Sequence, residues 1–145
     1  MPEIKMNAAQ AALRPKVPEG WLDPQKLPAH LKSTLVDPAK MEWVPSKFPG
    51  ISSKVLFADP ASGVSSILFK MEPGAIVPLH EHAALEQTWI IEGSLVDLDG
   101  AASAGQFVWR PGGNVHQAYS PNGAVLLGMF MKPNIFANGT EFYVE

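Results

Sequence analysis

The sequence contains no cysteine. Disulfides are therefore excluded, and no thiolate is available as a nucleophile or as a soft metal ligand. Long apolar runs are missing as well, because no stretch approaches the roughly 18 apolar residues of a membrane span. The segment from Met6 to Leu13 is interrupted by Asn7 and Gln10, so it lacks the apolar run of a secretory signal. These absences predict a soluble, cytoplasmic protein in which any metal would be bound by histidine and carboxylate.

Positive charge is not in excess. The chain has 11 Lys and Arg residues against 14 Asp and Glu residues, which gives a net charge of −3. Nucleic acids and anionic membranes bind to clustered basic residues, so this composition disfavours both kinds of partner. A small molecule is the partner that we expect.

The residues that are present predict one compact domain. The 145 residues are 46% hydrophobic and 17% charged, which is typical of a single globular domain of ordinary size. The 14 prolines and 12 glycines argue against a helical bundle, because proline removes a helix hydrogen bond. Many short strands and turns are expected instead.

Residues 1–49 contain eight of the prolines, which confine regular structure to short pieces such as a helix within residues 3–13. We predict that this region is a Pro-rich N-terminal arm, and that it packs on the domain formed by residues 50–145 because it also carries tryptophan and leucine. Such an arm covers a sheet edge or exchanges with a second subunit, and we expect a homodimer.

From residue 53 onward, runs of β-branched and aromatic residues alternate with turn residues. This pattern is typical of an all-β sandwich or barrel. About nine short strands fit a jelly-roll β-barrel, which is the fold that we predict. The predicted strands are 53–58, 64–71, 76–80, 86–91, 94–98, 106–110, 115–119, 124–132 and 140–144.

Three of the four histidines share a spacing that brings them to one face. Strand side chains alternate, so His80 and His82 point the same way. If the following strand keeps this parity, Glu86 joins them together with Thr88 and Ile90. The helical His-Glu-x-x-His zinc motif is excluded, because position 84 is alanine.

Two spaced motifs surround these residues. The first runs Gly74, five residues, His80-x-His82, three residues, Glu86, six residues, Gly93. The second runs Gly105, five residues, Pro111-x-Gly113, two residues, His116, with Ser120 in place of the usual closing asparagine. Both resemble the motifs of the cupin superfamily. The resemblance implies a single-domain cupin barrel with His80, His82, Glu86 and His116 as metal ligands.

Imidazole and carboxylate without thiolate suit one divalent transition metal per chain. We expect Fe(II), while zinc, manganese, nickel and copper(II) are compatible with the same ligands. Four protein ligands leave two positions open on an octahedral ion, as a dioxygenase requires, whereas a structural zinc closes at four.

Other polar residues are not expected to bind the metal. His30 is isolated in the arm, and Glu81 and Glu92 are expected to be solvated. Arg110 could reach an anionic substrate, but we predict that it forms a surface ion pair.

The apolar residues are expected to belong either to the core or to the pocket. Trp89, Phe107, Trp109, Met129 and Met131 are predicted to belong to the ordinary barrel core. The predicted substrate contacts are Phe69, Thr88, Ile90 and Phe130, because barrel pockets are apolar with a few polar groups.

Within the superfamily the chain resembles acetylacetone (β-diketone-cleaving) dioxygenases. The support is the one-domain length, the short gap of residues 94–104 between the motifs, and the segment 128–136. The resemblance implies cleavage of a C–C bond in a small β-diketone or related dicarbonyl by dioxygen at Fe(II). That family has a three-histidine site, so Glu86 either adds a ligand or acts as a catalytic base.

The sequence also resembles the cupin domain of ChrR-like anti-sigma factors, which suggests a non-catalytic metal or ligand sensor. Those proteins carry a helical zinc domain in front, and residues 1–49 lack the cysteines for one. A metal-dependent isomerase or epimerase is a third alternative, although no cluster of Lys and Arg offers a phosphate site.

Overall fold

The protein is described by a computed structural model that covers residues 4–137. Contacts divide the chain into two units, Met1–Leu35 and Val36–Glu145. Residues 36–49, which we predicted to be part of the arm, group with the strands. The packing of the preceding residues on the barrel stays a prediction.

The described part of the first unit consists of short helices and turns. It contains helix α1 (Met6–Ala11) and two 3-10 helices, η1 (Pro24–Lys26) and η2 (Ala29–Leu31). The predicted helix is therefore present with shorter bounds. No described residue of this unit is buried, so its tryptophan and leucines form no core among themselves. Among the described residues, no helix has the length and apolar character needed to cross a membrane.

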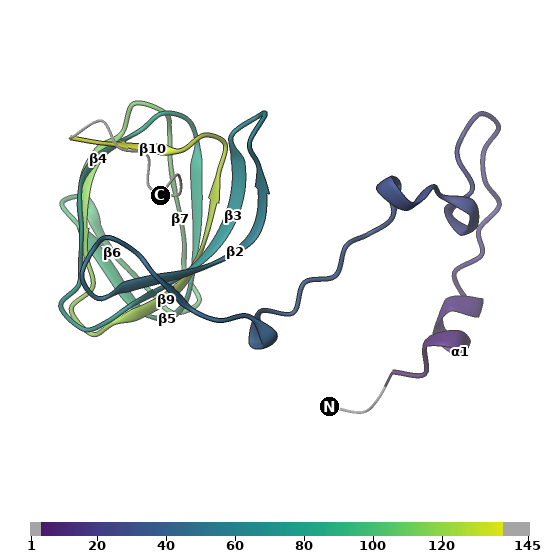
Figure 1. The fold of residues 1–145 in the computed structure, drawn as a ribbon, viewed down its shortest axis with the longest axis horizontal. Coiled ribbons are helices and arrows are strands. Elements are labelled where there is room, and N and C mark those ends of the chain that lie inside the picture. The colour runs from purple at the N-terminus through teal and green to yellow at the C-terminus, as the bar shows by residue number, and fades with distance from the viewer. Residues whose placement is uncertain (1–3, 138–145) are drawn as a thin grey trace. The chain divides into compact units, whose positions relative to one another are not determined.

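The second unit is all-β, as predicted (Figure 1). One 3-10 helix, η3 (Pro38–Lys40), precedes the strands. The strands are β1 (Val44–Pro45), β2 (Ile51–Asp59), β3 (Val64–Met71), β4 (Ile76–His82), β5 (Glu86–Asp97), β6 (Gly100–Ser103), β7 (Phe107–Arg110), β8 (Val115–Tyr119), β9 (Ala124–Phe130) and β10 (Asn134–Phe136). Strands β1, β6 and β10 were not predicted, and the predicted strand 140–144 lies outside the described residues.

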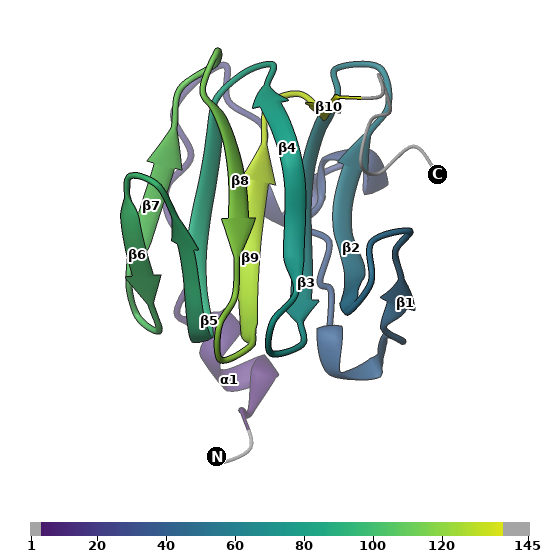
Figure 2. The same cartoon turned by 90° about the vertical axis from the view of Figure 1, so that its left-hand side faces the viewer.

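The strands form a curled antiparallel sheet in the order β1-β2-β3-β9-β5-β8-β4-β10, with β6 and β7 also paired to β5 (Figure 2). Strand β1 pairs with β2 and covers its edge. The Lys54 ammonium of β2 donates to the Pro38 carbonyl at 2.7 Å and lies 4.5 Å from the Trp43 ring centroid. Residues 36–49 are therefore held on the strands of the second unit.

Strand β5 connects the two halves of the curl. Its first part pairs with β9 and β7, and its last residues pair with β6 and β8. A register shift between Ile90 and Glu92 marks the bend. At Gly93, φ is +72° and a Cβ atom would lie 1.9 Å from the Gly123 carbonyl oxygen, so only glycine fits. The two predicted strands 86–91 and 94–98 are thus one bent strand.

The interior of the curl holds the apolar core. Side chains alternate along the strands, so residues such as Ile67, Ile90 and Leu126 point inward. Trp89, Phe107, Trp109 and Met131 are exposed, which corrects their prediction as core. Trp89 lies between the inward-facing Thr88 and Ile90, so strand alternation turns it outward whatever its hydrophobicity.

Candidate metal centre

Three histidines meet inside the barrel. His80 and His82 lie on β4, and His116 lies opposite His80 on β8. All three are buried, whereas Glu81 between the first two is exposed, as predicted. The ring centroids are 4.6 Å apart for His80 and His116, and 4.9 Å apart from His82 to each of them. One nitrogen from each ring lies within 4.8 Å of the other two, so the three can bind one ion.

Fixed acceptors hold the outer nitrogens of two of these rings. His80 Nδ1 lies 2.7 Å from the Pro78 carbonyl oxygen, and His116 Nδ1 lies 2.9 Å from Asp97 Oδ2. A carbonyl and an ionised carboxylate can only accept, so each Nδ1 carries the proton and donates it. In both neutral rings the lone pair is therefore on Nε2.

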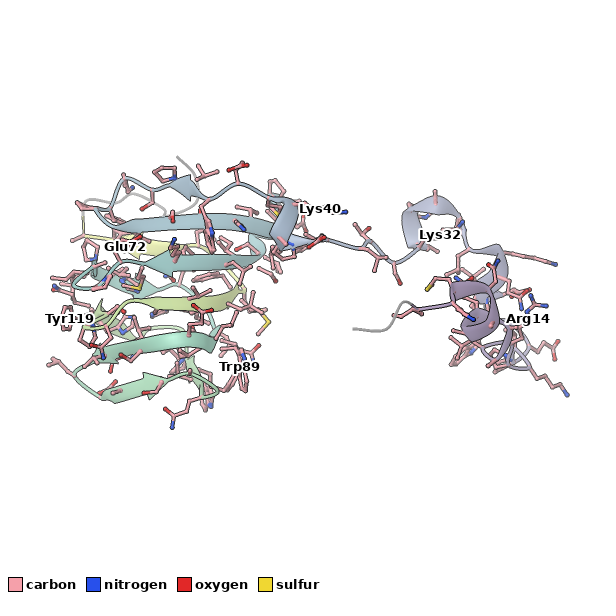
Figure 3. All side chains as sticks on the ribbon, turned by 90° about the horizontal axis from the view of Figure 1, so that it is seen from below. Arg14, Lys32, Lys40, Glu72, Trp89 and Tyr119 are labelled. Atoms are coloured by element: carbon pink, nitrogen blue, oxygen red, sulfur yellow. The ribbon has the colours of Figure 1, made fainter. Side chains whose placement is uncertain are left out.

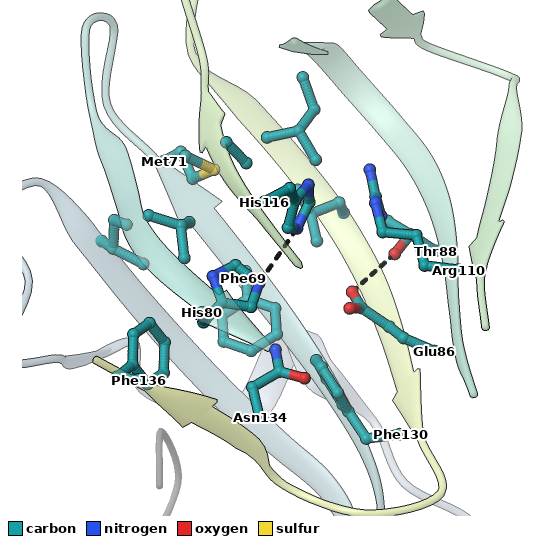
Figure 4. Close-up of a pocket in the computed structure, with 15 residues that line it drawn as sticks. Phe69, Met71, His80, Glu86, Thr88, Arg110, His116, Phe130, Asn134 and Phe136 are labelled. Atoms are coloured by element: carbon teal, nitrogen blue, oxygen red, sulfur yellow. Dashed lines mark hydrogen bonds between the residues drawn. The ribbon is translucent and has the colours of Figure 1, made fainter. Parts of the chain in front are cut away.

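The two Nε2 atoms lie 3.0 Å apart and face each other (Figure 4). Two lone pairs in this position repel each other unless a cation or a proton accepts them. A proton is disfavoured, because burial lowers the pKa of His80 to about 4 and also lowers the pKa of His116. A metal ion that takes both lone pairs therefore fits these residues.

His82 and Glu86 bring further polar atoms to the site. Both ring nitrogens of His82 and the Oε2 atom of Glu86 are buried. His82 Nδ1 lies 2.5 Å from Glu86 Oε2, and this contact helps to hold the carboxyl group ionised. A neutral ring that donates from Nδ1 keeps its lone pair on Nε2, which has no hydrogen-bond partner and therefore fits a bound cation. The three-histidine group does not include Glu86, whose role as a fourth ligand stays a prediction.

Glu86 is ionised although it is buried. Burial alone would raise its pKa, but the contact with His82, the charge of Arg110 and a hydrogen bond from Thr88 outweigh burial and hold the pKa below its ordinary value. The Thr88 hydroxyl donates to Oε1 at 3.0 Å (Figure 4), which leaves Oε2 towards His82. The site therefore contains a carboxylate oxygen that can take a cation or a proton.

Arg110 forms a buried ion pair, which corrects its prediction as a surface pair. Its Nη2 donates to Asp97 Oδ2 at 3.2 Å, and both side chains are 8% exposed. The β5–β7 register also places Arg110 opposite Glu86. Arg110 therefore lies beside two carboxylates, and its charge stabilises both in ionised form.

A small pocket opens beside the histidines (Figure 4). Its cavity volume is about 60 Å³, far below the roughly 300–1,000 Å³ of a pocket for a drug-sized ligand. Aromatic rings of Phe69, Phe130 and Phe136 form much of its wall. The polar residues of the lining are His80, Glu86, Thr88, Arg110, His116 and Asn134. The pocket is suited to a small ligand with an apolar body and oxygen atoms.

Most of the residues that we predicted for the site are brought together. The three histidines and Glu86 converge, and Phe69, Thr88 and Phe130 line the pocket. Ile90 belongs to the hydrophobic core and is not part of the lining. His30 and Glu92 are exposed and lie outside the site.

Sequence reasoning missed Asp97, Asn134 and Phe136, and it placed Arg110 wrongly. Asn134 and Phe136 come from the unpredicted strand β10, which pairs with β4 opposite His82 and His80. Strand alternation turns the side chains of Asn134 and Phe136 inward, but this rule could be applied only after residues 134–136 were known to form a strand. Asp97 lies in the predicted strand 94–98, but no motif position marks it.

The curled sheet and the inward-facing histidines define a cupin. The sequence matches the family of the ChrR cupin-like domain over residues 31–134. The match covers more than half of the chain, so the protein belongs to this family. No curated protein matches the sequence.

Solved structures support the same fold. An acetylacetone dioxygenase from Acinetobacter johnsonii has a TM-score of 0.63 at 21% identity, with 76% of this chain and 85% of that chain covered. An RmlC-like cupin from Ralstonia eutropha JMP134 has a TM-score of 0.66 at 18% identity, with 80% of each chain covered. A protein of unknown function with a cupin-like fold, also from Ralstonia eutropha JMP134, has 26% identity and a TM-score of 0.56. In that comparison 59% of this chain and 62% of the other chain are covered, so the chain spans less than two thirds of that protein.

Proposed function

We propose that the protein is a metal-dependent dioxygenase that cleaves a C–C bond of a small β-diketone or related dicarbonyl, with Fe(II) held by His80, His82 and His116. The observation that carries this proposal is the cluster of three buried histidines beside a small pocket, with the Nε2 atoms of His80 and His116 facing each other and that of His82 without a hydrogen-bond partner. The acetylacetone dioxygenase of the same fold supports the substrate class.

The pocket residues suit a dicarbonyl in its anionic enolate form. Phe69, Phe130 and Phe136 would pack on its carbon skeleton and exclude water. Arg110 places a positive charge beside the pocket, which favours an anionic ligand over a neutral one. Bound Fe(II) would act as a Lewis acid on the two oxygens and supply the redox chemistry of dioxygen.

Glu86 is the residue in the pocket that can accept the proton lost from the central carbon. Its Oε1 accepts from Thr88, whereas Oε2 lies 2.5 Å from His82 Nδ1, at the edge of the histidine cluster. Two roles are open to Oε2, as a fourth metal ligand or as this base, and they predict different results for Glu86→Gln. Loss of bound iron identifies the ligand, whereas full iron content with slow turnover identifies the base. Unchanged iron content and unchanged turnover would remove Glu86 from both roles.

Oxygen uptake tests the reaction itself. The iron-loaded protein should consume one dioxygen for each β-diketone and release a carboxylic acid and a second carbonyl product. A panel of 1,3-diketones of increasing size should show the fastest uptake with the smallest members, because the cavity is small. The protein treated with a chelator is the control. Absence of uptake with every member of the panel would contradict the dioxygenase proposal.

The family match favours a second candidate, a non-catalytic sensor of a metal or small ligand. A sensor would bind the metal at the same histidines and would not consume dioxygen. Calorimetric titration of the iron-loaded protein with a diketone under anaerobic conditions separates the two. Binding without turnover after air is admitted is the result expected of a sensor.

We also propose that the protein forms a homodimer. The support is an exposed apolar face on β5 and β7. Trp89, which is labelled in Figure 3, lies opposite Phe107 on this face, and Trp109 is 61% exposed. Exposed apolar patches of this kind mark interaction surfaces. Sedimentation at micromolar concentration should show a dimer that Trp109→Arg dissociates, and a wild-type monomer would contradict the proposal.

A further inference from the structure

Asp97, at the end of β5, makes four contacts with its two carboxylate oxygens. Oδ1 accepts from the backbone N–H of Asp99 at 2.9 Å and from that of Gly100 at 3.2 Å. Oδ2 accepts from His116 Nδ1 at 2.9 Å and from Arg110 Nη2 at 3.2 Å. The side chain is therefore held at both ends, by the turn that follows β5 and by two residues of the site.

These contacts leave no freedom in the direction of the hydrogen bond to His116. The two backbone groups and the guanidinium can only donate, so each oxygen of Asp97 must accept. His116 Nδ1 must then be the protonated nitrogen. The lone pair of the ring is directed to Nε2, which lies 3.0 Å from His80 Nε2.

We propose that Asp97 is a positioning residue that fixes His116 in the tautomer able to bind the metal, and that Arg110 holds Asp97 for this task. The inference deepens the proposed function, because it rests on the same metal site. For His80 the acceptor is a backbone carbonyl, which no substitution removes. Substitution of Asp97 can therefore test whether the tautomer of His116 controls metal binding.

Arg110 supports Asp97 and does not replace it. Both side chains of the pair are 8% exposed, so little water competes for the contact. The guanidinium offsets the negative charge that Asp97 brings beside the neutral ring of His116. A metal-bound histidine commonly donates its other N–H to a carboxylate in this way, which orients the ring and raises its basicity.

Asp97→Asn is a sharp test, because an amide has one acceptor oxygen for the four groups that donate to the Asp97 carboxylate. The two N–H groups at the Oδ1 position require an acceptor there, so the amide oxygen takes that place. The amide nitrogen then faces both His116 Nδ1 and Arg110 Nη2. The ring can accept from it, whereas the guanidinium can only donate and must turn away. The ring proton moves to Nε2, and the lone pair needed by the metal is lost.

The experiment uses two readouts on the full chain. Long-range ¹H–¹⁵N NMR spectra of the metal-free protein report which nitrogen of His116 is protonated, and competition with a chelator measures the affinity for Zn²⁺. The wild type should have a protonated Nδ1. Asp97→Asn should have a protonated Nε2 and bind Zn²⁺ about 10- to 100-fold more weakly. Asp99→Asn is the matched control, since this neighbouring residue is exposed and the change in charge is the same.

Two results would overturn the inference. One is a wild-type protein in which His116 is protonated on Nε2. This measurement does not depend on whether any variant folds. The other is an Asp97→Asn protein that retains the Nδ1 proton or binds Zn²⁺ within twofold of the wild type. A wild type that binds no Zn²⁺ would contradict the proposed metal site instead, and the NMR measurement would still decide the role of Asp97.

Discussion

The histidine side of the site, on β4 and β8, consists of three imidazole rings, whereas the side on β5 and β7 carries the charges of Glu86, Asp97 and Arg110. The Nε2 lone pairs of His80 and His116 face each other without a proton between them. On the charged side, Asp97 orients the ring of His116, and Glu86 supplies a buried carboxylate oxygen. The residues that can bind the ion and the charged residues around them thus lie on different strands. Substitutions on the two sides should therefore have different consequences.

The largest effect is expected on the histidine side. Replacing His82 with Gln removes a ligand nitrogen, and metal affinity should fall by roughly 100-fold or more, beyond the effect of a residue that only orients a ligand. Metal content after loading and dialysis measures this. His30→Gln is the matched control, because His30 is exposed in the first unit and should leave metal content unchanged. Equal metal content in the two variants would contradict the histidine site.

A pH effect of intermediate size is expected for the metal-free protein. The pKa of His80 is lowered from 6.5 to about 4 in the folded state, mainly by burial. The unfolded chain therefore binds more protons between these values, so stability decreases as the pH falls through this window. His80 should lower the free energy of unfolding by about 2 kcal/mol from pH 7 to pH 5. Urea unfolding with a chelator present measures it, and His80→Asn should abolish this part of the change.

The smallest effect is expected at Thr88, whose hydroxyl donates to Glu86 and not to a histidine. Thr88→Val keeps the shape of the side chain and removes the donor to Glu86 Oε1. The buried carboxylate loses a hydrogen bond, so the protein should be destabilised by about 1–2 kcal/mol. Metal affinity should change little if Glu86 is a base, because the histidines are untouched. A loss of metal comparable to that in His82→Gln would show that the two sides are not independent.

The all-β class and most strands were predictable because alternation and turn residues are local signals. Strand parity correctly turned His80, His82, Glu86 and Thr88 inward. The same rule places Trp89 outside, whereas its hydrophobicity favours the core, and in the structure the alternation decides. Strand β10 has only three residues, too few for a periodic pattern to be recognised.

The sequence by itself determined which residues can bind a metal, because the two spaced motifs place three histidines and a carboxylate on inward-facing strand positions. Only the tertiary structure decided how those groups are protonated and oriented. Asp97 and Arg110 are 13 residues apart, and Asp97 and His116 are 19 apart. Their meeting depends on the bend of β5 and its pairing with β7 and β8, and no local pattern encodes such a contact.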